Sequence, residues 1–195
     1  MIDWLEEIDR QIVLLINGLH FPIFDQIMWL ISSRFIWIPF YILLLVLVYR
    51  RKGFIPALLF LSSALLLVLI SDYLSVHAFK DVFQRYRPSH NLLISEKLHY
   101  YKLPNGQEYK GGQFGFISSH ASNFATITIF FILYLKELNF KWVFILPMIL
   151  VGFSRIYLGV HYLSDVLVGF LFGGVLAFCF YKFVFVKLIG KLKIQ

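Results

Sequence analysis

The sequence predicts an all-α integral membrane protein: a bundle of five transmembrane helices, or six, with an N-terminal amphipathic helix. Of the 195 residues, 59% are hydrophobic and only 15% are charged, and the mean hydropathy is +0.76. Soluble domains contain about 45–50% apolar and about 25% charged residues. The apolar runs are continuous, which indicates helices rather than the alternating strands of a membrane barrel. Since a span needs roughly 20 apolar residues, the length allows five or six spans in a single domain, 1–195.

Residues 1–34 are expected to form the amphipathic region. Apolar side chains recur at helical spacing, with acidic residues between them, at Ile2, Leu5, Ile8, Ile12 and Ile16. This pattern is typical of a helix that lies in the membrane interface. A second apolar segment at 21–31 either lies flat or leads into the first span. The acidic start of the chain does not resemble the basic beginning of a cleavable signal peptide.

Five apolar runs follow, and we expect spans at about 35–49, 54–76, 119–135, 142–157 and 163–187. The basic loops at 50–52 and 136–141 and the C-terminal tail, which carries Lys191 and Lys193, then fall on one side of the membrane. Because lysine and arginine collect on the cytoplasmic side, that side is predicted to be cytoplasmic. The N-terminus, the loop 77–118 and the short link 158–162 are predicted to lie outside.

The outer loop is itself basic, which the topology rule does not explain. Ionisable groups are costly at membrane depth and therefore suggest function. Here they gather in three segments at one membrane face. In the first segment, Lys80 and Arg87 are seven residues apart, so on a helix ending near Pro88 both would point the same way. Two cations on one face suit a phosphate dianion, although interfacial anchoring would also explain them.

The second segment, 115–123, comes immediately before an apolar run. Ser118 is suited to cap the helix that begins there, and a helix N-terminus attracts anions. His120, in the first turn, can transfer a proton. An ordinary capped helix with an interfacial histidine is the alternative.

The third segment is 154–165. His161 and Asp165 are four residues apart and share a helix face. A carboxylate on one imidazole nitrogen fixes the tautomer and leaves the other nitrogen free as a nucleophile. Arg155 supplies a third cation, and a structural ion pair is the alternative. Asp72, within the second span, is expected to pair with a cation of the site. The candidate partner is Lys80, which lies two turns further along.

Together the three segments resemble the signature of the type-2 phosphatidic acid phosphatase family, K-x6-R-P, P-S-G-H and S-R-x5-H-x3-D. Residues 80–88 and 154–165 match the first and third motifs in full. The second match is partial, because Ile117 and Ser119 replace its proline and glycine, while Ser118 and His120 remain.

The resemblance implies a phosphatase that needs no metal or other cofactor and works through a phosphohistidine. His161 would attack phosphorus, Asp165 would support it, and His120 would protonate the leaving oxygen and then activate water. The phosphate oxygens would be held by Lys80, Arg87, Ser118, Ser119 and Arg155. Undecaprenyl diphosphate is the first candidate substrate, and phosphatidate, phosphatidylglycerol phosphate and lipid A phosphates follow closely.

Two further readings of the site stay open. The phosphoryl group could pass to an alcohol instead of water, or the protein could carry lipid phosphates without catalysis. We expect a bacterial-type inner membrane, with the site at the periplasmic or outer face. Lipids are then the expected partners, and the hydropathy excludes a nucleic-acid partner. The turn signal at 103–106 predicts a small hairpin that roofs the site.

Overall fold

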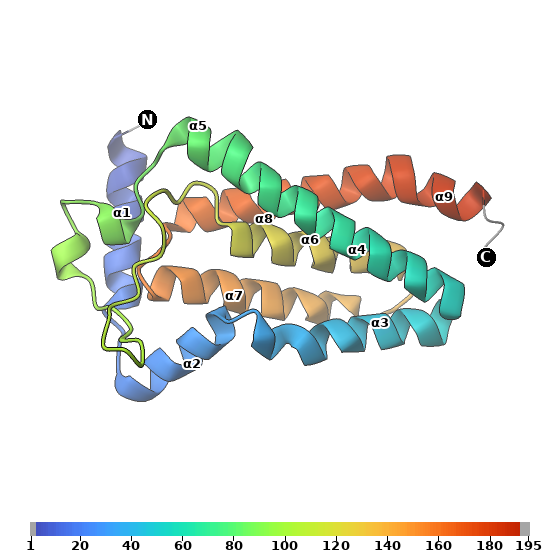
Figure 1. The fold of residues 1–195 in the computed structure, drawn as a ribbon, viewed down its shortest axis with the longest axis horizontal. Coiled ribbons are helices and arrows are strands. Elements are labelled where there is room, and N and C mark those ends of the chain that lie inside the picture. Colours follow the sequence, from blue (N-terminus) through green and yellow to red (C-terminus); the bar gives the residue numbers. More distant parts are fainter. Residues whose placement is uncertain (1–2, 192–195) are drawn as a thin grey trace.

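The structure, a computed structural model, describes residues 3–191, which form an elongated bundle of helices lying side by side (Figure 1). Ile2 and Lys193, used in the sequence predictions, lie outside the described residues. The long axis of the bundle is followed by α3 (Ile38–Lys52), α4 (Phe54–Leu74), α6 (Ser119–Tyr134), α7 (Ile145–Tyr157) and α8 (Leu163–Phe180). This arrangement confirms the predicted all-α class.

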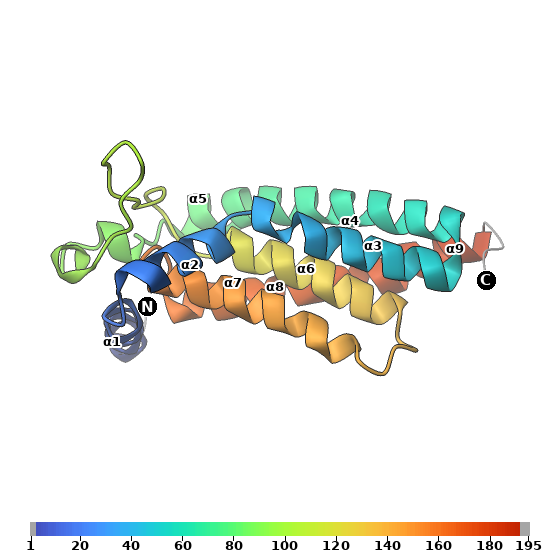
Figure 2. The ribbon, with the colours of Figure 1, turned by 90° about the horizontal axis from the view of Figure 1, so that it is seen from below.

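The N-terminal region forms α1 (Asp3–Asn17) and α2 (Pro22–Ser32), which meet at a bend of 119°. As Figures 1 and 2 show, α1 lies across one end of the bundle. Its apolar residues Leu5, Ile8 and Leu15 are exposed, as expected for a helix that contacts lipid in the membrane interface. The stripe that faces the protein is partly polar instead and consists of Asp9, Val13 and Asn17.

Two helices are longer than the sequence predicted. Helix α4 continues through a π-helical stretch, 75–80, and α5 (Asp81–Phe83), so the outer loop begins near residue 84 and not at 77. Helix α8 continues similarly through 181–185 into α9 (Val186–Lys191). Both continuous helices are long and apolar enough to cross a membrane, and α1 with α2 would make a third span if the bent pair is a single one. Helices α3, α6 and α7 have only 13 to 16 residues, so five spans remain a prediction.

Helices α6 and α8 pack closely through small side chains. A Cβ atom on Gly173 would lie 2.2 Å from the carbonyl oxygen of Ser122, and one on Gly169 would lie 2.8 Å from that of Ser118. Glycine and serine let helices approach in this way inside membranes. The close packing holds the first turn of α6 against the second and third turns of α8. The Ser118 N–H also donates to the Asp165 carbonyl in the first turn of α8, so two of the sequence motifs meet here.

The segments predicted to share a membrane side do share an end of the bundle. Lys52 and Glu137, from the two short basic loops, form an ion pair of 3.1 Å, and α9 ends nearby (Figure 1). Helix α1, the outer loop and the link 158–162 lie at the opposite end (Figures 1 and 2).

The outer loop contains the predicted hairpin. The backbone N–H of Leu103 donates to the carbonyl of Gln107 over 2.8 Å, and Tyr109 N donates to the Tyr101 carbonyl over 2.9 Å. Tyr101 stacks on Trp29 of α2, with ring centroids 4.6 Å apart. The hairpin is therefore anchored to the N-terminal region, and its Tyr109 side reaches the site described next.

Candidate active site

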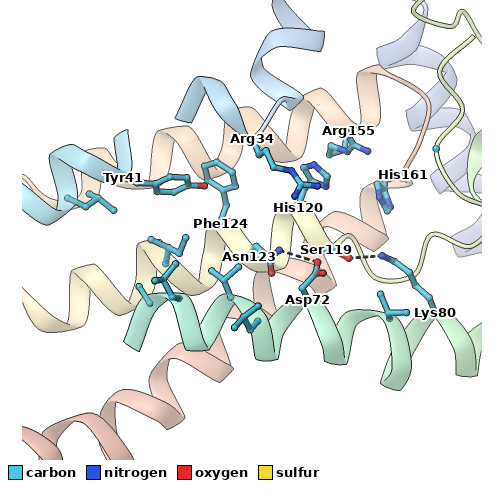
Figure 3. Close-up of a pocket in the computed structure, with 18 of the residues that line it drawn as sticks. Arg34, Tyr41, Asp72, Lys80, Ser119, His120, Asn123, Phe124, Arg155 and His161 are labelled. Atoms are coloured by element: carbon cyan, nitrogen blue, oxygen red, sulfur yellow. Dashed lines mark hydrogen bonds between the residues drawn. The ribbon is translucent and has the colours of Figure 1, made fainter. Parts of the chain in front are cut away.

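A cavity of about 720 Å³ lies at the outer-loop end of the bundle and extends between α3, α4 and α6. One part of its wall is polar and contains Lys80, His120, Arg155 and His161 of the sequence-predicted site residues (Figure 3). Arg87 also lines this part. Ser119 lines it too. The rest of the wall is mainly apolar and includes Leu44, Leu45, Phe60, Leu65 and Phe124. The cavity thus suits an amphiphile with an anionic head.

His161 lies in the link before α8, which begins at Leu163, so the prediction that it shares a helix face with Asp165 is wrong. The side chain is nevertheless held between this carboxylate and an arginine. Its Nδ1 lies 3.3 Å from Asp165 Oδ2, and its Nε2 lies 3.1 Å from Arg87 Nη1. Arginine is a donor only, so Nε2 accepts this bond and the proton sits on Nδ1. Burial, followed by the charges of Arg87 and Arg155, holds the pKa of His161 well below its usual range. The imidazole is therefore neutral, and its unprotonated Nε2 accepts from Arg87 where His161 lines the cavity.

Lys80, Arg87 and Arg155 form a cation cluster around this nitrogen. Lys80 Nζ donates to Ser119 Oγ over 2.5 Å, and Arg155 Nη2 donates to the Tyr109 hydroxyl over 2.9 Å. Burial, followed by the charge of Arg155, lowers the pKa of Arg87 to about 10, which leaves it protonated at neutral pH. The buried Nε of Arg155 has no hydrogen-bond partner within the described part of the chain. The cation cluster is thus ready to receive an anion.

The expected helical relation between Lys80 and Arg87 is wrong. The helix ends at Phe83, and Gln84 turns the chain through a left-handed backbone conformation with φ of 46°. Arg87 instead lies in the loop, and its backbone N–H donates to the Gln113 carbonyl over 3.1 Å. The loop folds back on itself, and that tertiary pairing brings the two cations together.

Gly111 and Gly115 make room for the Arg87 side chain. A Cβ atom on Gly111 would lie 3.0 Å from Arg87 Nη1, and one on Gly115 would lie 3.0 Å from Arg87 Cγ. Gly111 also has a φ of 67°, which favours glycine.

Ser118 caps α6, as predicted. Its hydroxyl accepts from the Ala121 N–H over 3.5 Å, and its own N–H donates to the Asp165 carbonyl over 3.0 Å. The side chain is fully buried and does not line the cavity. The structure therefore gives Ser118 a capping contact, whereas Ser119 and His120 reach the cavity.

Sequence reasoning missed a buried network behind His161. Arg85 donates to Asp165 Oδ1 over 2.9 Å and to Asp9 Oδ2 over 2.8 Å. Asp9 Oδ1 also accepts from the backbone N–H of Ser164 over 3.1 Å. The carboxylate that supports His161 is thereby tied to the amphipathic helix α1. The basic outer loop was a signal for Arg85, but no local pattern marked Asp9.

Arg34, Tyr109 and Asn123 also line the cavity and were not predicted. Asp72 lines it as well, but it accepts a hydrogen bond from Asn123 Nδ2 over 3.3 Å, whereas Lys80 donates to Ser119. The expected pairing of Asp72 with Lys80 is therefore wrong, because Asn123 of α6 donates to the Asp72 carboxylate instead.

Within residues 3–191, no three His, Cys, Asp or Glu side chains are grouped to hold a metal ion.

Comparison with known proteins agrees with this geometry. The family model described as the PAP2 superfamily matches residues 57–189. A lipid A 4'-phosphatase of Porphyromonas gingivalis is 33% identical over 180 residues, which is 92% of this chain and 74% of that protein. A lipid A 4'-phosphatase of Bacteroides thetaiotaomicron is 31% identical over 193 residues, 99% of this chain and 84% of that protein.

Two crystal structures have a similar fold. A transmembrane PAP2-type phosphatidylglycerolphosphate phosphatase from Bacillus subtilis has a TM-score of 0.67 at 24% identity, covering 92% of this chain and 85% of its own. LpxE of Aquifex aeolicus has a TM-score of 0.63 at 24% identity, covering 89% of this chain and 94% of its own. The chain therefore belongs to the PAP2 superfamily, and its class is that of the membrane lipid phosphatases.

Proposed function

We propose that this protein hydrolyses a lipid phosphate through a phosphohistidine on His161, without a metal ion. One observation carries the proposal. The unprotonated Nε2 of His161 lies at the cavity, 3.1 Å from Arg87 Nη1, while Nδ1 faces the Asp165 carboxylate. A neutral imidazole beside cations and backed by a carboxylate is suited to attack phosphorus and to become positively charged.

In the first step, Nε2 bonds to phosphorus and the bond from phosphorus to the lipid oxygen breaks. His120, which lines the cavity beside His161, gives a proton to that oxygen (Figure 3). In the second step, His120 takes a proton from water, and the resulting hydroxide displaces His161 from phosphorus. The products are the lipid alcohol and inorganic phosphate, and both histidines return to their starting states.

The cation cluster stabilises charge on the phosphate oxygens in both steps. Lys80 enters from the helical extension of α4, Arg87 from the outer loop and Arg155 from α7, and Ser119 adds a hydroxyl. Because these groups are already in place and largely shielded from water, they need little rearrangement as charge develops. Ser118 contributes by capping the helix that carries Ser119 and His120.

Lipid A carrying a 4'-phosphate is the substrate we propose first. Two relatives that match more than nine-tenths of this chain are named for that activity, which favours it over undecaprenyl diphosphate, phosphatidate and phosphatidylglycerol phosphate. We place the site at the outer face of a bacterial inner membrane. The basic loops at the opposite end of the bundle support that orientation.

The test is phosphate release in detergent with EDTA, from lipid A, phosphatidate and undecaprenyl diphosphate. Wild type is expected to release phosphate, lipid A being the best substrate, and His161→Ala is expected to release none. Undiminished release by His161→Ala would overturn the phosphohistidine. Loss of phosphate from the lipid without free phosphate would indicate transfer to an alcohol, and binding without turnover would indicate a carrier.

A further inference from the structure

We infer that Ser75 is a positioning residue for phosphoryl transfer, which holds the Lys80 ammonium at the phosphate site through the hydroxyl of Ser119. This inference rests on the proposed function and gives a part to a side chain outside the three sequence motifs. It also explains Ser119, which stands where the family motif has glycine. Glycine has no hydroxyl, so the motif itself does not supply this contact.

The three side chains form a continuous series of contacts between the α4 helix and α6. Lys80 Nζ lies 2.5 Å from Ser119 Oγ (Figure 3). Ser119 Oγ lies 2.6 Å from Ser75 Oγ, and Ser75 Oγ lies 2.8 Å from the carbonyl oxygen of Asp72. Ser75 is fully buried, whereas Ser119 and Lys80 line the cavity. The series therefore begins inside the protein and ends at the phosphate site.

Only one arrangement of the hydroxyl protons makes all three contacts hydrogen bonds. A lysine ammonium only donates, a carbonyl only accepts, and each serine has a single proton. The Ser75 proton therefore goes to the Asp72 carbonyl. Ser119 must then donate to Ser75, and its oxygen accepts from Lys80. This leaves Ser119 no proton for a phosphate oxygen, so its hydroxyl acts on the phosphate through Lys80.

The π-helical stretch 75–80 accounts for the meeting of Ser75 and Lys80 at one hydroxyl. In an α-helix, residues five apart point in directions about 140° apart. A π-helical turn closes between residues i and i+5, which brings such residues toward one face. Both side chains can therefore reach Ser119 on the neighbouring helix.

The contact with Ser119 restrains a side chain that has a long, flexible stem. Asp72, the expected partner of Lys80, is bonded to Asn123 instead. Ser119 takes one N–H of the ammonium, and the two others are left for phosphate oxygens. A charge that is already in place stabilises the transition state with little rearrangement. Loss of the restraint should therefore slow the reaction.

The experiment measures kcat/KM for phosphate release in detergent, with the lipid phosphate that wild type hydrolyses best. Ser75→Ala removes the acceptor of the Ser119 proton and is expected to lower kcat/KM about fivefold, as for loss of one hydrogen bond. Ser119→Ala should lower it about tenfold, and Ser119→Thr, which keeps a hydroxyl, should retain the wild-type value. In the Ser119→Ala protein, Ser75→Ala should have no further effect, because Ser75 acts through the missing hydroxyl.

Ser71→Ala is the matched control. Ser71 precedes Ser75 by four residues, about one turn, and its Oγ lies 2.5 Å from that of Ser122 on α6. This second serine pair joins the same two helices and is fully buried, but it does not line the cavity. The kcat/KM of Ser71→Ala should therefore stay at the wild-type value.

Three results would overturn the inference alone. Wild-type or higher kcat/KM in Ser75→Ala would mean that the Ser119 proton serves the phosphate directly. An equal loss in Ser71→Ala would reduce Ser75 to helix packing, and additive losses in the double variant would exclude a path through Ser119. Should Ser75→Ala fail to fold, full activity of Ser119→Ala would overturn it too. Failure of wild type to release phosphate from any lipid overturns the proposed function instead.

Discussion

At the scale of single residues, the neutrality of His161 is the feature on which the site depends. The residue is only 1% exposed, and its side chain lies next to Arg87, with Arg155 and Lys80 also close enough to oppose a positive charge on it. A protonated imidazole could neither accept from Arg87 nor attack phosphorus. The same surroundings should make protonation of His161 harmful to the folded state.

This gives a prediction for stability against pH. Because the pKa of His161 is lowered in the folded state, the unfolded chain binds more protons below about pH 6.5, and stability is lost as pH falls through that range. The melting temperature of wild type should therefore fall between about pH 7.5 and about pH 5.5. His161→Gln should show a smaller fall over the same range. Equal falls in the two proteins would contradict the account.

At the scale of helices, α1 is tied to the site, because its Asp9 pairs with Arg85, which also pairs with Asp165. Asp9→Asn should lower kcat about tenfold, which corresponds to an activation barrier higher by about 1.4 kcal/mol. KM should change little, because Asp9 positions the Asp165 carboxylate without touching substrate. Glu7→Gln is the control on the same helix, since Glu7 is exposed and its side chain accepts from its helical neighbours Arg10 and Gln11. Equal activity of the two variants would show that the α1 contact has no part in positioning.

The contact between α6 and α8 gives a second prediction at this scale. Gly173→Ala should destabilise the protein by about 1–3 kcal/mol, because the new methyl group would collide with the Ser122 carbonyl. Gly174→Ala is the matched control, since its Cβ would meet only Ile129 at 3.8 Å, and it should change stability by less than about 0.5 kcal/mol. Thermal unfolding in detergent measures both, and similar melting temperatures would refute the packing argument.

How well the sequence predicted each contact depends on how far apart the two residues lie along the chain. The pair His161 and Asp165 and the cap at Ser118 are local, so the sequence could indicate both contacts. His161 precedes α8, however, so its contact with Asp165 comes from the turn into the helix and not from a shared helix face. The meeting of Lys80 with Arg87 depends on a loop that folds back, so helical spacing gave the wrong reason for it. Asp9 with Arg85, and Asp72 with Asn123, are joined across more than 50 residues. The helical or strand periodicity of a sequence does not indicate contacts between residues so far apart along the chain.

At the scale of the whole molecule, the cation cluster and the basic loops lie at opposite ends of the bundle. This separation explains why the chain carries lysine and arginine at both ends. One set is expected to orient the protein in the membrane, and the other to bind phosphate. The cavity joins the phosphate end to the apolar interior, so that a lipid can keep its tail among the helices while its head reaches His161.

The proposed orientation predicts the outcome of thiol labelling in cells. With the exposed Cys179 replaced by alanine, Asn105→Cys in the hairpin should react with a membrane-impermeant maleimide on spheroplasts. Lys136→Cys, at the other end of the bundle, should react only after the membrane is permeabilised. The reverse pattern would place the site at the cytoplasmic face.

The most direct test of the account is to trap the covalent intermediate. Wild type, His120→Ala and His161→Ala are mixed with lipid carrying a radioactive phosphate and quenched at short times. We expect an acid-labile, alkali-stable label on His161 in wild type and no label in His161→Ala. Because we propose that His120 activates the water, the label should persist longer in His120→Ala wherever the first step still occurs. Full phosphate release with no labelled protein at any time would contradict the phosphohistidine.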